Sequence, residues 1–267
     1  MQQLVNNNLI HYEIIGTGVP VVFLHGLCLD LNSMKYQYEP AFTGKNYQRI
    51  YVDLPGMGKS QSFYDVQPSG DYLVELIIKF LDAIKINNFY LCGHSYGGYL
   101  SLGIAHKYSE RVKGLFLTCP VVTANSNQRI IETHINIQKD GFEVPDNEYT
   151  EDFIGMNVMI NEVSWQKYVT EVVPGLKNCD FKFIKNLQAD NFYHYEFKNE
   201  HELKKWESDI PTFLLLGKHD QIVGFKEQVS MAHHFNRCDL LVLEQAGHNL
   251  PIDQPKMLEN CIDYFFD

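Results

Sequence analysis

Hydrophobic residues gather in six short runs that are spread along the chain. Each run holds four to seven apolar residues rich in Val, Ile, Leu and aromatics, and each ends near Gly, Pro, His or Asp. Such runs are too short for buried helices and are typical of strands covered on both faces of a parallel sheet. We therefore predict six buried strands, in "PVVFLHG", "QRIYVDLPG", "NFYLCGHS", "VKGLFLTCP", "PTFLLLGKHD" and "DLLVLEQAGH".

Longer segments with helical spacing lie between these runs, at 71–84, 95–108 and 226–235. Strands that alternate with helices indicate βαβ units. The opening "LVNNNLIHYEIIGTG" differs, because Asn-rich turn residues separate two extended runs, which favours an antiparallel hairpin at the sheet edge. Together these patterns predict an α/β fold with a doubly wound, mostly parallel sheet of eight strands.

The alternation stops after Pro120 and resumes near Ile210. The segment between holds both tryptophans and amphipathic stretches such as "RIIETHINIQ" and "VSWQKYVTEVV", without a clear buried strand. We predict a helical cap over residues 121–207, inserted after the sixth strand. Residues 1–120 and 208–267 then form the core domain.

Composition narrows the classes of partner. The formal net charge is −11, which disfavours binding to nucleic acid or to anionic membranes. No run of 18 apolar residues is present, and "MQQLVNNNLI" does not resemble a secretory signal, so we predict no membrane span. The six cysteines form no CxxC pair, as expected of buried thiols in a reducing compartment. These features predict a cytoplasmic protein.

One candidate for chemistry is Ser95 in "LCGHSYGGYL". A strand, then Gly93-His94-Ser95-Tyr96-Gly97, then a helix is the context of a nucleophile elbow. The flanking glycines leave room for a tight strand-to-helix turn that raises the serine hydroxyl above the sheet. We predict Ser95 to be a nucleophile.

A serine hydroxyl needs a general base, and the base needs an acid that orients it. Asp220 follows the run "TFLLLGKH" and His248 follows "LLVLEQAG", in the chain order Ser, Asp, His that accompanies this elbow. Both are predicted at the carboxyl ends of strands, where open parallel sheets bind ligands. We interpret His94 as a residue that packs beside the turn.

The same chemistry requires two backbone N–H groups for the developing oxyanion. One comes from the residue after the nucleophile, and the other from an early strand-to-helix loop. We assign these donors to Tyr96 and, in "FLHGLC", to Leu27.

Five motifs then carry a resemblance: "HGLC", "DLPGMGKS", "GHSYGG", "GKHDQIV" and "AGHNLPIDQP". In this order they resemble the α/β-hydrolase superfamily, in the branch with a serine nucleophile and a helical cap between the sixth and seventh strands. The resemblance implies no metal and no cofactor. It also implies that Asp53, Gly56, Gly58 and Ser60 form a tight structural loop near the site.

Other readings of the motifs are weaker. "VDLPGMGKS" lacks the first glycine of a phosphate-binding loop, because that position is Asp53. No histidine pair has the spacing of a metal site on one element. The chain also resembles proline iminopeptidases and carbon–carbon bond hydrolases, which share this architecture and are alternatives within the superfamily. An inactive ligand-binding receptor of the same fold is an alternative of a different class.

We expect a small-molecule acyl substrate, a small to medium carboxylic ester with an apolar portion, and a protein that is a monomer or a homodimer. The substrate would enter between Leu27, Tyr96 and the cap. Two or three apolar cap residues are expected to line the pocket, from a set that comprises Phe142, Tyr149, Phe153, Met156, Met159, Trp165 and Phe192.

Overall fold

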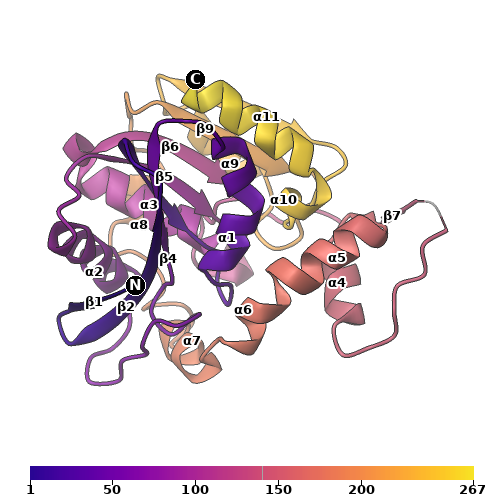
Figure 1. Cartoon of the computed structure of the whole chain (residues 1–267), viewed down its shortest axis with the longest axis horizontal. Coiled ribbons are helices and arrows are strands. Elements are labelled where there is room, and N and C mark those ends of the chain that lie inside the picture. The colour runs from indigo at the N-terminus through magenta and orange to yellow at the C-terminus, as the bar shows by residue number, and fades with distance from the viewer. Residues whose placement is uncertain (140) are drawn as a thin grey trace.

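The apolar runs of the sequence form one eight-stranded sheet (Figure 1). The computed structural model describes residues 1–139 and 141–267. All neighbouring strands from β4 to β10 pair in parallel, whereas β1 and β2 pair antiparallel with each other and β2 pairs antiparallel with β4. The predicted fold class is thereby confirmed. In spatial order the strands are β1 (Gln2–Val5), β2 (Asn8–Ile15), β4 (Tyr47–Val52), β3 (Val19–Leu24), β5 (Phe89–His94), β6 (Val112–Thr118), β9 (Thr212–Gly217) and β10 (Cys238–Leu243).

The N-terminal hairpin closes through a two-residue turn at Asn6 and Asn7. Both residues have positive φ, 47° and 63°. Two consecutive residues in this region define the turn whose twist matches paired antiparallel strands, and asparagine tolerates the conformation better than most residues. The Asn-rich stretch therefore sets the edge of the sheet.

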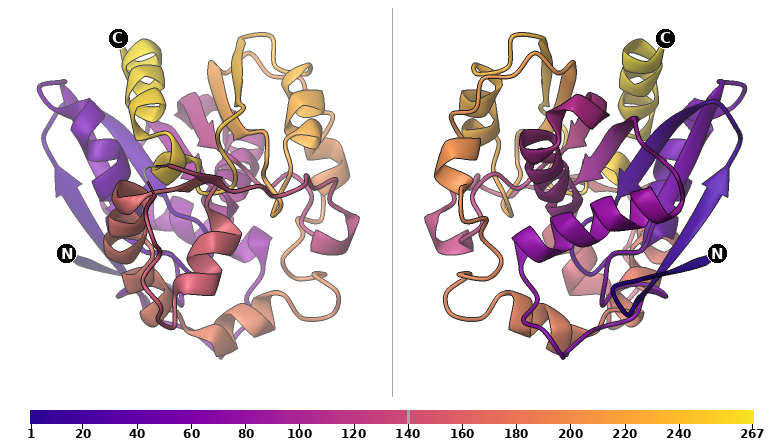
Figure 2. Two further views of the ribbon diagram at one scale, coloured as in Figure 1. Left: turned by 90° about the vertical axis from the view of Figure 1, so that its right-hand side faces the viewer. Right: turned by 90° about the vertical axis from the view of Figure 1, so that its left-hand side faces the viewer.

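Helices cover both faces of the sheet (Figures 1 and 2). Helix α1 contacts α11 on one face, and α2 contacts α3 on the other. The predicted helices at 71–84, 95–108 and 226–235 correspond to α2, α3 and α9. The bounds are α1 (Leu31–Tyr38), α2 (Gly70–Ala83), α3 (Tyr96–Lys107), α9 (Lys226–Ala232), α10 (Leu250–Asp253) and α11 (Pro255–Phe266), with short 3-10 turns at Glu39–Phe42, Ser109–Arg111 and Ser126–Gln128.

Central strands are buried on both faces, as their unbroken apolar runs predict. All six residues of β9 are buried, and Phe116 of β6 stacks on Phe213 with ring centroids 5.2 Å apart. Strand β10 is different, and the prediction that it is buried on both faces is wrong. It lies at the sheet edge, where it pairs with β9, and none of its six residues is buried, with Leu240 exposed.

The segment between β6 and β9 carries short helices and a two-stranded β7–β8 pair. "VSWQKYVTEVV" is helical as expected, but "RIIETHINIQ" is not: residues 129–136 have no regular secondary structure, and the last two residues form β7. An amphipathic pattern does not itself decide between these states when the chain lies against other elements. The elements are β7 (Ile137–Gln138), α4 (Thr150–Met156), β8 (Met159–Ile160), α5 (Glu162–Glu171), α6 (Val173–Lys177), α7 (Phe181–Leu187) and α8 (Glu200–Leu203).

Two hydrophobic clusters divide this segment. Phe153, Trp165 and Tyr168 pack together in a small cluster that also takes Ile252 from α10. Phe183 and other residues of α7 instead belong to the main hydrophobic core of the protein. The first part of the segment therefore has a core of its own, while the second part is anchored to the main domain.

Candidate active site

Ser95 lies on a strained turn between β5 and α3. Its backbone has φ 53° and ψ −115°, a conformation that non-glycine residues rarely adopt. A Cβ at Gly93 would lie 2.7 Å from the carbonyl oxygen of Gly97, and one at Gly97 would lie 2.0 Å from that of Leu24. Any larger side chain would push the turn apart, so the two glycines permit the bend that presents Ser95.

The three residues predicted from separate strand ends come together at this turn. His248 Nε2 lies 2.9 Å from Ser95 Oγ, and His248 Nδ1 lies 2.8 Å from Asp220 Oδ2. A carboxylate only accepts hydrogen bonds, so Nδ1 carries the proton and Nε2 of the neutral ring accepts from the serine hydroxyl. This arrangement has the geometry of a base that removes the Ser95 proton.

Asp220 is held rigidly and is fully buried. Its Oδ1 accepts the backbone N–H groups of Ile222 and Val223, at 2.9 Å and 2.8 Å. Its Oδ2 accepts the hydrogen bond from His248 Nδ1. Hydrogen bonds to two N–H donors compensate the carboxylate for its burial and fix its orientation.

His94 packs beside the turn, as its position in the elbow suggests. Its ring lies 5.3 Å from that of His248, and its Nδ1 lies 3.1 Å from Thr118 Oγ1. Burial, assisted by the nearby His248, lowers the pKa of His94 to about 3. The ring is therefore neutral near pH 7 and does not bring a second positive charge to the site.

The two residues assigned as oxyanion donors lie on either side of Ser95. Leu27 lines the cavity above the serine, and Tyr96 is the first residue of α3. Within 1–139 and 141–267, no hydrogen bond engages the backbone N–H of either residue. Both groups are thus free to bind an oxygen of a ligand.

His25 fixes the loop that carries Leu27. Its Nδ1 donates to the carbonyl oxygen of Gly26 at 2.7 Å, and its Nε2 accepts the N–H of Leu54 at 3.0 Å. Burial lowers the pKa of His25, which keeps the ring in the neutral form that this pair of bonds requires. The histidine of "FLHGLC" is a brace for the loop.

The "DLPGMGKS" stretch forms a tight loop around Asp53. The carboxylate accepts the N–H groups of Leu31 and Lys59, at 2.7 Å and 2.9 Å, and contacts His11. Gly58 has φ 57°, and a Cβ there would lie 2.4 Å from the Asp53 carboxylate. These contacts suit a structural loop.

Sequence reasoning missed Asp253, which ties the His248 loop to the segment above it. Its Oδ2 accepts the N–H of Gly247 at 2.9 Å, and its Oδ1 accepts those of Val158 and Met159 at 3.0 Å and 2.9 Å. Burial raises the pKa of Asp253 to about 6 despite these bonds, which act in the opposite direction. The available signal was a carboxylate directly after the apolar residues Leu250, Pro251 and Ile252.

A cavity of about 170 Å³, which we name the Ser95 cavity, opens above the serine. Most of its wall is apolar. Of the seven cap residues expected as candidates, Met156 alone appears among its described lining, so the expectation of two or three is wrong. Phe153 and Trp165 are used in the small cluster instead. The lining comprises Gly26, Leu27, Leu29, His94, Ser95, Asp152, Met156, Val172, Leu176, Ile222, His248 and Asn249.

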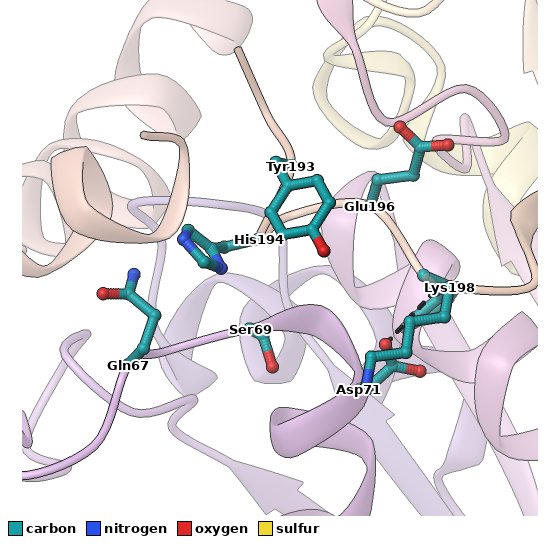
Figure 3. A pocket seen from close by; sticks show the side chains of 8 residues that line it. Gln67, Ser69, Asp71, Tyr193, His194, Glu196 and Lys198 are labelled. Atoms are coloured by element: carbon teal, nitrogen blue, oxygen red, sulfur yellow. Dashed lines mark hydrogen bonds between the residues drawn. The ribbon is translucent and has the colours of Figure 1, made fainter. Parts of the chain in front are cut away.

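A larger groove of about 450 Å³ lies elsewhere, between the start of α2 and the chain before α8. Figure 3 shows Gln67, Ser69 and Asp71 on one side, and Tyr193 and His194 on the other. The hydroxyl of Ser69 accepts the N–H of Tyr72 as the cap of α2. Among the described residues no hydrogen bond joins Ser69 to a histidine, although His194 lines the same groove. We therefore place the chemistry at the smaller Ser95 cavity, where Ser95 and His248 are in hydrogen-bond contact.

Across residues 1–139 and 141–267, no group of three or more His, Cys, Asp and Glu side chains is arranged to hold a metal ion. The helices that the structure describes include none that is both long and apolar enough to cross a membrane.

Comparison with known proteins agrees with the fold. Residues 21–259 match the model of the alpha/beta hydrolase family. The chain belongs to this family. The solved structure of an alpha/beta superfamily hydrolase from Oenococcus oeni PSU-1 superposes with a TM-score of 0.92 at 38% identity, covering 99% of this chain and 97% of that one.

Two curated relatives carry names of activities. The chain is 26% identical to the monoacylglycerol lipase ABHD6 of Homo sapiens, over 83% of this chain and 68% of the relative. It is 25% identical to the 2-hydroxy-6-oxononadienedioate/2-hydroxy-6-oxononatrienedioate hydrolase of Burkholderia vietnamiensis, over 90% and 84%. The family and these names support hydrolase activity.

Proposed function

We propose that this protein is a serine hydrolase that cleaves a small to medium carboxylic ester through an acyl-enzyme intermediate. The observation that carries the proposal is the continuous chain of contacts from Ser95 Oγ to His248 and on to Asp220, at 2.9 Å and 2.8 Å. Nucleophile, base and orienting acid are each within hydrogen-bond distance of the next.

In the proposed mechanism Ser95 Oγ attacks the ester carbonyl while His248 Nε2 takes its proton. The tetrahedral oxyanion is bound by the N–H groups of Leu27 and Tyr96, and Asp220 stabilises the imidazolium. His248 then gives the proton to the departing alcohol, which leaves an acyl group on Ser95. A water molecule, deprotonated by His248, releases the acid by the reverse path.

The Ser95 cavity supports a small acyl group. Its volume of about 170 Å³ is below the roughly 300–1,000 Å³ of common ligand pockets. Leu27, Leu29 and Val172 give it an apolar wall. We further propose that residues 121–207 act as a cap that bounds this cavity, and that the enzyme works in the cytoplasm, where its six free cysteines would stay reduced.

A carbon–carbon bond hydrolase with the same triad is an alternative, since one relative is named for such substrates. That name denotes a dicarboxylate, and no Lys or Arg is found among the described residues that line the Ser95 cavity. An anion in an apolar pocket needs a cation or several donors, so the lining favours an uncharged ester. An aminopeptidase and an inactive receptor are the remaining alternatives.

The test is a substrate panel assayed with wild type and with Ser95→Ala. It comprises p-nitrophenyl esters of increasing acyl length, a proline anilide and a vinylogous diketone. We expect turnover of the short esters, and a loss of about 10⁴-fold or more in Ser95→Ala. Turnover of the diketone or the anilide alone would instead assign one of the alternatives.

A further inference from the structure

The Ser95 cavity contains one acidic side chain that the proposed mechanism does not use. Asp152, in the first turn of α4, lines the cavity together with Ser95 and His248. It comes from the segment above the sheet, whereas the reacting groups come from the core. Asp152 therefore belongs to the wall that a bound substrate faces.

The carboxylate of Asp152 is held at one oxygen. The hydroxyl of Tyr168 donates to its Oδ2, and Tyr168 itself is fully buried. Tyr168 is also packed between Phe153 and Trp165 in the small cluster, so the donor is fixed in place. A rigid donor on one oxygen orients the carboxylate and leaves the other oxygen available to a ligand.

The charge of Asp152 is not balanced inside the cavity. In the described lining it is the one Asp, Glu, Lys or Arg, and the other groups there are apolar side chains, the reacting pair, His94 and Asn249. Burial keeps His94 neutral, with its pKa lowered to about 3. Asp152 is itself exposed to solvent. A carboxylate beside an apolar cavity still repels another carboxylate and attracts a cation, although water and salt make this weaker than it would be for a buried group.

We infer that Asp152 sorts substrates by charge, so that the Ser95 cavity takes uncharged esters and esters with an ammonium group, and rejects those whose acyl part ends in a carboxylate. The inference rests on the proposed ester hydrolysis and specifies which esters undergo it. It assigns to Asp152 a role in binding rather than in bond breaking.

Three p-nitrophenyl esters of similar length test the inference. They are the pentanoate, the half-ester of glutarate and the γ-trimethylammoniobutyrate, each corrected for its rate of hydrolysis in alkali. The enzymes are wild type, Asp152→Asn and Glu151→Gln. Glu151 is the neighbour of Asp152 on α4, is exposed as Asp152 is, and is outside the described cavity lining, so its substitution changes the net charge equally without changing the cavity.

We expect wild type to prefer the pentanoate over the glutarate in kcat/KM by about tenfold, a difference typical of one nearby charge at partial exposure. Asp152→Asn should reduce that preference to about twofold or less and lower kcat/KM for the ammonium ester. Glu151→Gln should keep the wild-type order. An unchanged order in Asp152→Asn, or equal use of all three esters by wild type, would overturn the inference.

Affinity measurements distinguish a failure of charge selection by Asp152 from a failure of the proposed ester hydrolysis. The affinities of the three esters for Ser95→Ala protein, measured by calorimetry, should fall in the order ammonium ester, pentanoate, glutarate. If wild type hydrolyses none of them and this order is still found, ester hydrolysis is wrong and the charge selection stands. If the order is absent as well, both are wrong.

Discussion

Asp253 Oδ2 accepts the backbone N–H of Gly247 at 2.9 Å, on the residue directly before His248. Its other oxygen accepts the N–H groups of Val158 and Met159 in the segment above the sheet. One buried carboxylate thus joins the loop of the proposed base to the start of β8, in the segment between β6 and β9. Its removal should affect both stability and turnover.

Asp253→Ala should lower the free energy of unfolding by about 2–4 kcal/mol, because three buried N–H groups lose their acceptor. It should also lower kcat, since the Asp253 carboxylate no longer holds the His248 loop through the N–H of Gly247. Urea denaturation and ester turnover measure the two effects. Asp65→Ala, at an exposed position, is the control, expected within about 0.5 kcal/mol of wild type. Equal stabilities for both variants would contradict the role of Asp253.

The titration of Asp253 predicts a second, pH-dependent effect. Burial raises its pKa from the ordinary 3.8 to about 6, so between these values the folded protein binds a proton that the unfolded chain has released. Folding is then favoured at the acid end, and the contribution of Asp253 to stability falls as pH rises from about 4 to about 6.

This effect is isolated by the difference in unfolding free energy between wild type and Asp253→Asn, which no longer titrates at this position. The difference should decline by about 2–3 kcal/mol over the interval. A difference that is flat, or that grows with pH, would show that Asp253 keeps an ordinary pKa in the folded protein.

Gly97→Ala should be severely destabilising. The added Cβ would lie 2.0 Å from the carbonyl oxygen of Leu24, and neither backbone segment is free to move. Overpacking of this kind costs about 1–3 kcal/mol or more. Gly155→Ala is a matched control, because nothing lies within 4 Å of its added Cβ and alanine favours the helix by about 0.5–1 kcal/mol. Thermal unfolding should show opposite shifts, and a mild Gly97→Ala would refute the tight elbow.

His94→Gln distinguishes the two histidines next to Ser95. Because burial lowers its pKa to about 3, His94 does not titrate between pH 5 and 9. It should therefore not contribute to any fall in kcat as the pH is lowered across this range. We expect His94→Gln to leave the pH of half-maximal kcat unchanged, while His248→Ala should lose about 10³-fold or more of kcat. A shift of that pH in His94→Gln would show that His94 titrates in this range.

The sequence predicts the sheet, and the meeting of the three candidate residues at one end of it, for a physical reason. Buried parallel strands leave continuous apolar runs, and the residue after each run must lie at one edge of the sheet, so Ser95, Asp220 and His248 are expected to meet. The five motifs that resemble the family also occur in the family's order along the chain, which supports the same three residues. Even the hairpin turn at Asn6 and Asn7 is marked by residues that tolerate positive φ.

The structure of the segment between β6 and β9 is less predictable from the sequence. Residues 129–136 have no regular secondary structure. Whether such a segment is helical depends on the surfaces it contacts, and an amphipathic pattern does not show which surfaces these are. The pairing of Asp152 with Tyr168 and of Asp253 with Met159 joins residues 16 and 94 positions apart. Such contacts between side chains and remote segments are set by packing, so the composition of the Ser95 cavity had to come from the structure.

The central claim is that Ser95 is a nucleophile activated by His248. Intact-protein mass spectrometry after treatment with a fluorophosphonate, followed by peptide mapping, tests it most directly. We predict a single adduct on Ser95, absent from Ser95→Ala and formed about 10³-fold more slowly or worse in His248→Ala. No adduct on Ser95, or the same rate of labelling without His248, would contradict the account.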